Sequence, residues 1–205
     1  MSKLTRPILP DVFPRKRLFE LLDSMRKQPV TWVSGPGGCG KTTLVSSYLE
    51  SQKLPCLWYQ LDQGDKDPAT FFYYLAQGAK EAYPEKEISL PLFTPEFSQG
   101  LPTFTHWYSE KLFGLLEIPT ILVFDNFHEV PEESPLPEII LHILTRLPEG
   151  FNIFILSRSD PPAALIRLRA NHQMEMMGWD ELRLTLAEAE GIIQLREPQF
   201  CSRKM

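Results

Sequence analysis

The residues best suited to chemistry lie in one short glycine-rich stretch. Residues 35–42 read GPGGCGKT and match the P-loop (Walker A) pattern G-x-x-x-x-G-K-[ST] at every fixed position. Glycines let a backbone curl so that successive N–H groups converge on a phosphate, and a helix that follows adds the positive end of its dipole. The sequence therefore predicts a phosphate-binding loop. The residues expected to contact the nucleotide are Gly35, Gly37, Gly38, Cys39, Gly40, Lys41, Thr42 and Thr43.

A second chemical signal is an aspartate that ends an apolar run. Residues 121–124 read ILVF and are followed by Asp125. A carboxylate at the carboxyl end of a parallel strand faces the crevice in which open α/β sheets bind their ligands. Lys41 is expected to place its ammonium on the β- and γ-phosphates, and the Thr42 hydroxyl and Asp125 are expected to hold Mg²⁺ directly or through water.

The residue after Asp125 departs from the usual hydrolytic pattern. Many hydrolytic P-loop enzymes have a second acid there, which orients or deprotonates water, but this chain has Asn126. An amide can hydrogen-bond water but cannot take its proton. Loss of general-base assistance would slow hydrolysis by roughly 10²–10⁴-fold. Glu129 and Asp62 are the alternative acids, and the sequence leaves both open.

The third catalytic candidate, after Lys41 and Asp125, is Arg158, in the segment LSRSDPP (156–162). It follows the fourth predicted strand. If that strand lies between the strands that carry the phosphate loop and Asp125, the guanidinium can contact the γ-phosphate through its planar fork. The alternative is an arginine in a surface turn.

Alternating strands and helices must position these residues. Apolar runs predict strands at residues 30–34, 56–61, 120–124, 151–156 and 173–177. Helical patterns cover residues 41–50, 68–82, 103–116, 134–147 and 163–170, and a capping box at 185–188 begins a last helix. Residues 84–102 contain four prolines and are predicted to form a surface excursion. This alternation predicts an α/β fold with a parallel sheet.

Composition narrows the class of protein. Among 205 residues, 21 Lys and Arg against 26 Asp and Glu give a net charge of −5, which disfavours a surface that coats nucleic acid. Apolar stretches fall short of the ~20 residues that span a bilayer, and the N-terminus lacks the apolar segment of a secretory signal. Three scattered cysteines without a CxxC pair disfavour disulfides and zinc and fit a reducing cytoplasm. The four histidines, His106, His128, His142 and His172, are scattered and not expected to bind a metal.

The motifs and their order resemble a known family. The chain is similar to the STAND class of signal-transduction NTPases, and more narrowly to the maltose-regulon-activator branch of the large LuxR-type transcriptional regulators. The resemblance covers roughly residues 5–195. It is carried by GPGGCGKTT (35–43), LDQGD (61–65), FDNFHEV (124–130), LSRSDPP (156–162) and residues 14–18, 167–170 and 179–185.

The resemblance implies a three-layer P-loop NTPase core of ASCE type, with a five-stranded, mostly parallel sheet flanked by helices. It places the fourth strand between the first and the third. It also implies that ATP or ADP and Mg²⁺ bind at Lys41, Thr42 and Asp125, that Arg158 senses the γ-phosphate, and that residues 12–15 approach the adenine. In that family ATP favours an open, self-assembling state, ADP favours a closed monomer, and hydrolysis resets the switch.

The implied function is an ATP/ADP-binding regulatory switch module in the cytoplasm, linked to transcription regulation. Its expected partners are the nucleotide and either further copies or regulatory domains; this chain itself would bind neither nucleic acid nor membrane. Family members usually have two acids where this chain has Asp125 and Asn126, so ATP hydrolysis is expected to be slow, and whether the chain is an enzyme stays open. A P-loop kinase acting on a small molecule and a non-catalytic protein-interaction module are the alternatives.

The resemblance also bears on domain organisation. Residues 1–195 are expected to form the NTPase core and residues 196–205 a C-terminal tail, a candidate truncation point. Family members continue into a winged-helix domain, a helical-repeat sensor and a DNA-binding helix-turn-helix, whereas this sequence ends at Met205. The expectation is therefore a fragment, a truncated product or a stand-alone core that acts through partners.

Overall fold

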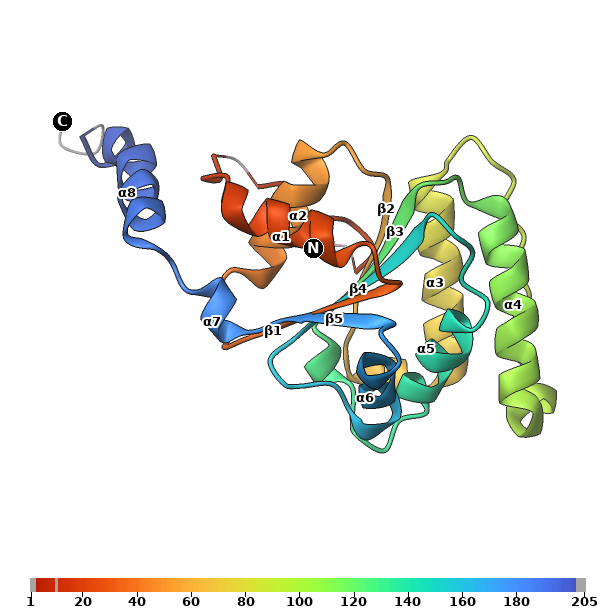
Figure 1. The fold of residues 1–205 in the computed structure, drawn as a ribbon. Helices are drawn as coiled ribbons and strands as arrows, with labels where there is room; N and C mark the ends of the chain where they lie inside the picture. Colours follow the sequence, from red (N-terminus) through yellow and green to blue (C-terminus); the bar gives the residue numbers. More distant parts are fainter. Residues whose placement is uncertain (1–2, 10, 202–205) are drawn as a thin grey trace.

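A single parallel sheet organises the chain, which a computed structural model describes over residues 3–9 and 11–201 (Figure 1). The strands are β1 (Val30–Ser34), β2 (Cys56–Gln60), β3 (Thr120–Asp125), β4 (Phe151–Ser157) and β5 (Met174–Met177). Their order is β2-β3-β4-β1-β5, and every neighbouring pair is parallel. The predicted α/β fold is confirmed, including the position of the fourth strand between the first and the third.

Helices cover both faces of this sheet and give the three predicted layers. The helices are α1 (Lys16–Met25), α2 (Lys41–Ser51), α3 (Pro68–Ala82), α4 (Leu101–Leu115), α5 (Leu136–Leu144), α6 (Ala163–Ala170), α7 (Trp179–Leu182) and α8 (Leu186–Cys201). Short 3₁₀ turns are η1 (Gln63–Lys66), η2 (Pro95–Gly100) and η3 (Phe127–Glu129). In Figure 1, α1 and α2 lie on one face and α3 to α6 on the other, while α8 leads away from the sheet.

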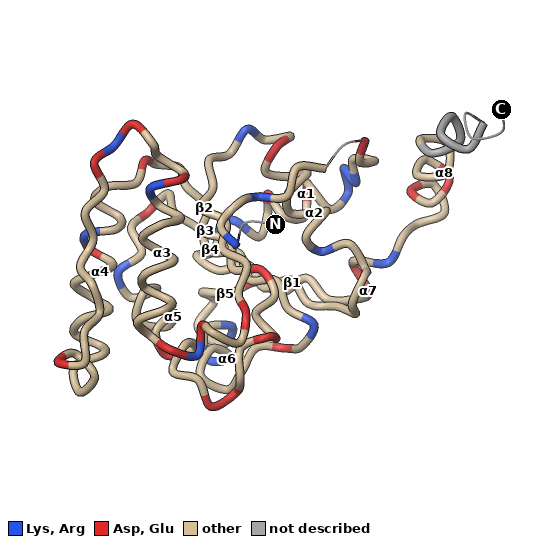
Figure 2. The backbone as a smooth tube through the Cα atoms, turned by 180° about the vertical axis from the view of Figure 1, so that it is seen from behind, with Lys and Arg blue, Asp and Glu red and all other residues tan. Residues whose placement is uncertain are grey.

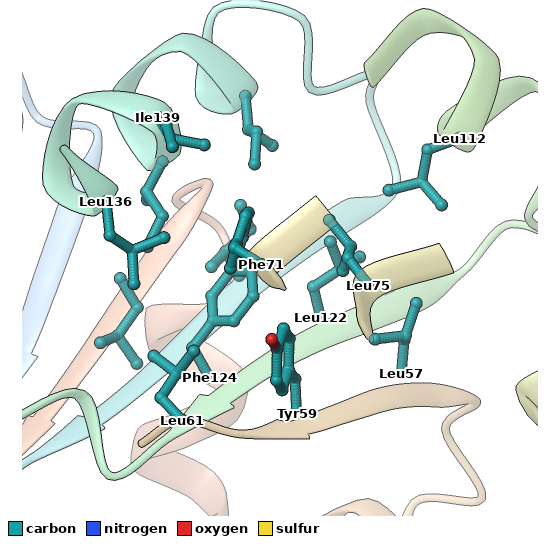
Figure 3. Close-up of a cluster of buried hydrophobic side chains, with 14 of the residues drawn as sticks. Leu57, Tyr59, Leu61, Phe71, Leu75, Leu112, Leu122, Phe124, Leu136 and Ile139 are labelled. Carbon is teal, nitrogen blue, oxygen red and sulfur yellow. The ribbon is translucent and has the colours of Figure 1, made fainter. Parts of the chain in front are cut away.

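Two hydrophobic clusters hold the layers together, one on each face of the sheet. Figure 3 shows the larger one, in which Phe71 and Leu75 of α3 pack on Leu122 and Phe124 of β3 and on Tyr59 of β2. All six residues of β3 are buried. A strand covered on both faces reads as a continuous apolar run, because neither side alternates with polar residues. This is why the apolar run before Asp125 predicted its strand correctly.

The element boundaries differ from prediction in a few places. The helix predicted to end near Leu147 ends at Leu144, because the N–H groups of Arg146 and Leu147 bond to carbonyls three residues earlier. The segment predicted as an excursion contains η2 and the first turn of α4, where Pro102 occupies a position that tolerates proline. α8, the last helix, which the predicted capping box precedes, extends from Leu186 to Cys201.

The histidines are less scattered than the sequence indicates. The rings of His106 on α4 and His142 on α5 lie 5.3 Å apart, edge to face. Even so, the described residues contain no group of three side chains suited to hold a metal ion.

The distribution of charged residues and the polarity of the helices bear on what the chain could bind. Lys and Arg are interspersed with Asp and Glu over the described chain (Figure 2). Every helix within residues 3–9 and 11–201 is too short or too polar to cross a bilayer.

Candidate functional site

The predicted phosphate loop joins the end of β1 to the start of α2. Within it, Gly38 (φ +77°) and Gly40 (φ +90°) adopt left-handed backbone that a side chain would disfavour. No described heavy atom lies within 4 Å of the position that a Cβ would take at either glycine. The loop thus curls beside open space at the N-terminus of an 11-residue helix. Unpaired N–H groups and the helix dipole make such a place suited to an anion.

Lys41 turns its ammonium back into this loop. The residue is 9% exposed, and Nζ donates to the carbonyl oxygens of Gly35 at 2.7 Å and Pro36 at 3.0 Å. The Cys39 sulfur lies 3.7 Å from the same nitrogen. An ionised phosphate oxygen forms a stronger, charge-assisted hydrogen bond with an ammonium than a neutral carbonyl does. The ammonium is therefore placed where an anion entering the loop would meet it.

Thr42 and Asp125 lie in contact, although the chain separates them widely. The Thr42 hydroxyl donates to Asp125 Oδ2 at 3.0 Å, and the Asn126 N–H donates to Oδ1 at 2.9 Å. Burial raises the pKa of Asp125, which is 3% exposed; the hydrogen bonds from Thr42 and Asn126 and the charge of Lys41 oppose that rise only in part. A buried carboxylate beside a hydroxyl is a hard-oxygen donor pair of the kind that Mg²⁺ prefers. These two residues fit the predicted magnesium site.

Arg158 lies against the phosphate loop while remaining exposed. It directly follows β4, the strand between β1 and β3. A Cβ built on Gly37 would stand 3.5 Å from Arg158 Nε and 3.6 Å from Cζ. The side chain is exposed, as the surface-turn alternative required, yet the guanidinium covers the glycine-rich loop.

The two alternative acids occupy different settings. Asp62 forms an ion pair with Lys3 at 2.8 Å and accepts the Gly64 N–H, so its carboxylate caps η1 and tethers the N-terminal segment. Glu129 ends η3, the turn that follows β3, and its Oε1 lies 3.3 Å from Nε2 of His128. Its side chain is 41% exposed.

His128 is the residue that sequence reasoning missed. Its side chain is 14% exposed, and both ring nitrogens are buried without a hydrogen-bond partner among the described residues. Burial lowers the pKa of the imidazole; the positive charges of Arg158 and Lys41 lower it further, and Glu129 opposes them. In the sequence it counted only as one of four scattered histidines, although it lies in FDNFHEV (124–130), one of the segments that carry the family resemblance.

A cavity of about 790 Å³ adjoins His128. It opens between the segment after β3 (residues 127–138) and the segment after β4 (residues 159–164). Its lining includes the acids Glu132, Glu133, Glu138 and Asp160. The carboxyl ends of β3 and β4 are therefore followed by segments that enclose a cavity, and its lining contains no residue of the phosphate loop.

The segment that the resemblance places near the adenine binds the C-terminal elements. Arg15 Nη2 donates to the carbonyls of Leu182 and Arg183, both at 2.9 Å, and to Glu188 Oε2 at 3.0 Å. The predicted capping box is confirmed, since Glu188 accepts the N–H of Thr185 and donates its own N–H to the Thr185 hydroxyl. Residues 12–15 and the start of α8 are thus fixed to each other.

Comparison with known proteins agrees with this architecture. Residues 12–158 match the family model described as Nephrocystin 3, N-terminal. The HTH-type transcriptional regulator MalT of Serratia proteamaculans is 31% identical over 206 residues, which is 95% of this chain and 22% of the regulator. MalT of Yersinia enterocolitica is 28% identical over the same shares. The chain therefore spans about a fifth of the length of these curated relatives, and the predicted resemblance to this branch is confirmed.

The fold has a counterpart among solved structures. The Orc1 protein of Aeropyrum pernix, solved in complex with DNA, superposes with a TM-score of 0.54 at 16% identity, over 93% of this chain and 51% of that chain. At that identity the likeness is one of fold. It agrees with the three-layer core predicted from the sequence.

Proposed function

We propose that this chain, which belongs to the family described as Nephrocystin 3, N-terminal, is an ATP- and ADP-binding switch module of a MalT-like regulator. The observation that carries the proposal is the meeting of three features at one edge of the sheet. These are the glycine-rich loop with the Lys41 ammonium, the Thr42–Asp125 contact, and the Arg158 guanidinium over the loop. Each supplies a group that a triphosphate needs.

The proposal assigns each group a role. Backbone N–H groups of Gly35 and of residues 37–43 would surround the phosphates, with Lys41 on the β- and γ-oxygens and Arg158 at the γ-phosphate. Thr42 and Asp125 would hold Mg²⁺, which supplies positive charge to the phosphate oxygens when bound. Asn126 can hydrogen-bond water without taking its proton, so ATP hydrolysis is expected to be slow.

The setting of the module follows from its relatives. They are HTH-type transcriptional regulators, of which this chain matches about a fifth, so the link to transcription is proposed to run through partner domains or further copies. The interspersed basic and acidic residues along the described chain support a module that does not itself bind nucleic acid (Figure 2). We place the module in the cytoplasm, where ATP is abundant.

The kinase alternative finds less support. A phosphoryl-transfer lid needs cations over the phosphates, and Lys86 is the one Lys or Arg in residues 84–102. Its Nζ is bonded to the Leu115 carbonyl at 3.1 Å and paired with Glu117 at 3.0 Å. These contacts hold it beside the end of α4.

Titration with a fluorescent ATP analogue in Mg²⁺ tests the proposal. Lys41→Ala removes a charge-assisted contact worth about 1.5–3 kcal/mol, which corresponds to a Kd raised about 10- to 150-fold. Lys111→Ala is the matched control, because Lys111 is exposed on α4. The control should bind as the unmodified chain does. Equal Kd values for the unmodified chain and Lys41→Ala would refute the proposal.

A further inference from the structure

We propose that His106 and His142 together bind one divalent metal ion of the class that prefers imidazole, with Zn²⁺ as its representative, and that the ion joins α4 to α5. The inference is independent of the proposed function, because neither histidine has a part in the nucleotide site. It revises the expectation that these histidines bind no metal, which rested on their separation in the sequence.

Two neighbouring helices bring the histidines together. His106 lies within α4 and His142 near the end of α5, and both helices lie on the same face of the sheet (Figure 1). Buried apolar residues of both helices, among them Tyr108 and Ile143, belong to the same hydrophobic cluster, which fixes the spacing of the helices. The two imidazole rings are half-buried, so water reaches the pair.

The distance between the rings suits one shared ion. Zinc lies about 2.0–2.1 Å from an imidazole nitrogen, which puts it about 3.2 Å from the centre of the ring. Two imidazoles that bind one ion at a tetrahedral angle then have ring centres about 5.2 Å apart. The ring centres of His106 and His142 are 5.3 Å apart, so both can reach one ion while the helices stay in place. Water would complete the four-coordinate shell.

An ordinary edge-to-face contact between two rings has a similar spacing, so the hydrogen bonds decide between the two readings. The Thr145 hydroxyl donates to the carbonyl of His142 at 2.7 Å, which leaves its oxygen as an acceptor. His106 Nε2 lies 3.1 Å from that oxygen and therefore carries the proton. In a neutral imidazole, Nδ1 then keeps the lone pair that a metal needs. Metal-binding histidines usually donate their second ring nitrogen in this way, which fixes the tautomer and the ring orientation.

The remaining groups around the pair are compatible with a cation. Within residues 3–9 and 11–201, neither ring nitrogen of His142 forms a hydrogen bond, so this ring can turn toward His106 without losing one. Burial lowers the pKa of His106; Arg146 and His142 lower it further, and Glu110 opposes them. The ring is therefore neutral at about pH 7, the form that binds a metal. Arg146 pairs with Glu110 at 3.4 Å, which offsets part of its positive charge.

Proton NMR of the histidine rings during a titration with chelator-buffered Zn²⁺ tests the site. The Cε1–H signals are assigned by their loss in His106→Gln and in His142→Gln. We expect both signals to shift and to reach saturation at the same free Zn²⁺ concentration. His172, which is exposed, is the internal control and should respond only at higher concentrations. Each ring is observed separately, so zinc held by cysteines does not confuse the result. If Zn²⁺ left either signal unchanged, the inference would be overturned.

The single variants distinguish one shared ion from two separate ones. Because a shared ion needs both rings, His106→Gln should raise the Zn²⁺ concentration at which the His142 signal shifts at least about 10-fold, and His142→Gln should do the same to His106. An unchanged response of the remaining ring would show that the histidines bind zinc independently, and the shared site would be wrong.

The positioning role of Thr145 has its own test. Thr145→Ala removes the acceptor of the His106 Nε2 proton and should weaken zinc binding about 10- to 100-fold. Thr145→Ser keeps the hydroxyl and should bind zinc as the unmodified chain does. Equal binding by the alanine and serine variants would contradict this role.

Two controls separate the outcomes. Thermal unfolding identifies any variant that fails to fold, and the paired shift of both signals in the unmodified chain then still decides whether the site exists. The fluorescent ATP analogue should bind His106→Gln and His142→Gln with the Kd of the unmodified chain. Failure of the nucleotide proposal would therefore leave the metal site standing, and failure of the metal site would leave nucleotide binding unaffected.

Discussion

Replacing Asp125 by asparagine should stabilise the ligand-free chain and abolish its stabilisation by Mg²⁺-ATP. The carboxylate is 3% exposed, and the described residues that hydrogen-bond it are neutral donors, the Thr42 hydroxyl and the Asn126 N–H. Asparagine keeps the shape, still accepts the Asn126 N–H and donates to the Thr42 oxygen. The substitution therefore removes a desolvated charge without leaving a cavity.

The expected magnitudes follow from burial and from binding linkage. Relieving an unfavourable group at a functional site commonly yields about 0.5–2 kcal/mol. At about 1 kcal/mol, a domain of this size gains about 2–4 °C in Tm. For the unmodified chain, ATP at 100 times its Kd adds about 2.7 kcal/mol, or about 5–11 °C. Asp125→Asn should not show this gain in Tm on addition of Mg²⁺-ATP.

The stability gain should depend on pH with a definite sign. Burial raises the folded-state pKa of Asp125, so folding favours its protonated form. The penalty for Asp125 is absent below the unfolded-state pKa of about 3.9 and grows as the pH rises through the folded-state value. The advantage of asparagine should thus be larger at neutral pH than at about pH 4 and should disappear below the unfolded-state pKa.

Thermal unfolding with and without Mg²⁺-ATP, at neutral and acidic pH, provides the assay. Asp11→Asn, at an exposed position, is the matched control and should behave as the unmodified chain does. The reasoning would be refuted if Asp125→Asn lowered the ligand-free Tm at neutral pH. A full shift of Asp125→Asn with Mg²⁺-ATP would refute the metal-binding role.

Three other outcomes are expected. Glu188→Ala leaves the buried Arg15 guanidinium with its carbonyl partners alone and should cost about 2–4 kcal/mol of unfolding free energy, measured with urea; a cost under about 0.5 kcal/mol would contradict this. Iodoacetamide should modify Cys39, which lies in the loop, faster than Cys56, because burial raises the pKa of the Cys56 thiol. ATP should slow the modification of Cys39 alone, and mass spectrometry follows both reactions. Gly38→Ala should lower Tm by about 2–8 °C, because the cost is that of left-handed backbone, about 1–2 kcal/mol, with no clash to add; an unchanged Tm would count against the loop conformation.

Much of the fold and the core of the candidate site followed from local pattern. The phosphate loop and the apolar run before Asp125 are encoded over a few consecutive residues, and parallel strands bring their carboxyl ends to one edge. These local patterns were enough to predict the contact between Thr42 and Asp125. The position of Arg158 over Gly37 also depends on the order of strands in the sheet. That order came from the family resemblance rather than from any local signal.

Tertiary burial accounts for what the sequence did not reveal. His128 has no distinctive spacing in the sequence, and only the structure shows that its two ring nitrogens are buried without a hydrogen-bond partner among the described residues. Asp62 looked available as an acid because it ends a strand, but Lys3 comes from the distant N-terminal segment to pair with it. An ion pair between remote segments leaves no periodic trace, so local analysis overestimates how many polar groups are free for chemistry.

The loop glycines also show that one motif can satisfy separate physical demands. Gly38 has a left-handed backbone, as a phosphate loop requires, but Gly35 does not have a positive φ. A Cβ at Gly35 would stand 3.1 Å from both the Cys39 sulfur and Leu182 Cδ1, so this glycine is required by close packing. Leu182 belongs to α7, and its carbonyl accepts a hydrogen bond from Arg15. The first glycine of the loop therefore lets α7 approach the phosphate site closely, and a side chain there would press on Cys39 and on Leu182, the residue whose carbonyl Arg15 binds.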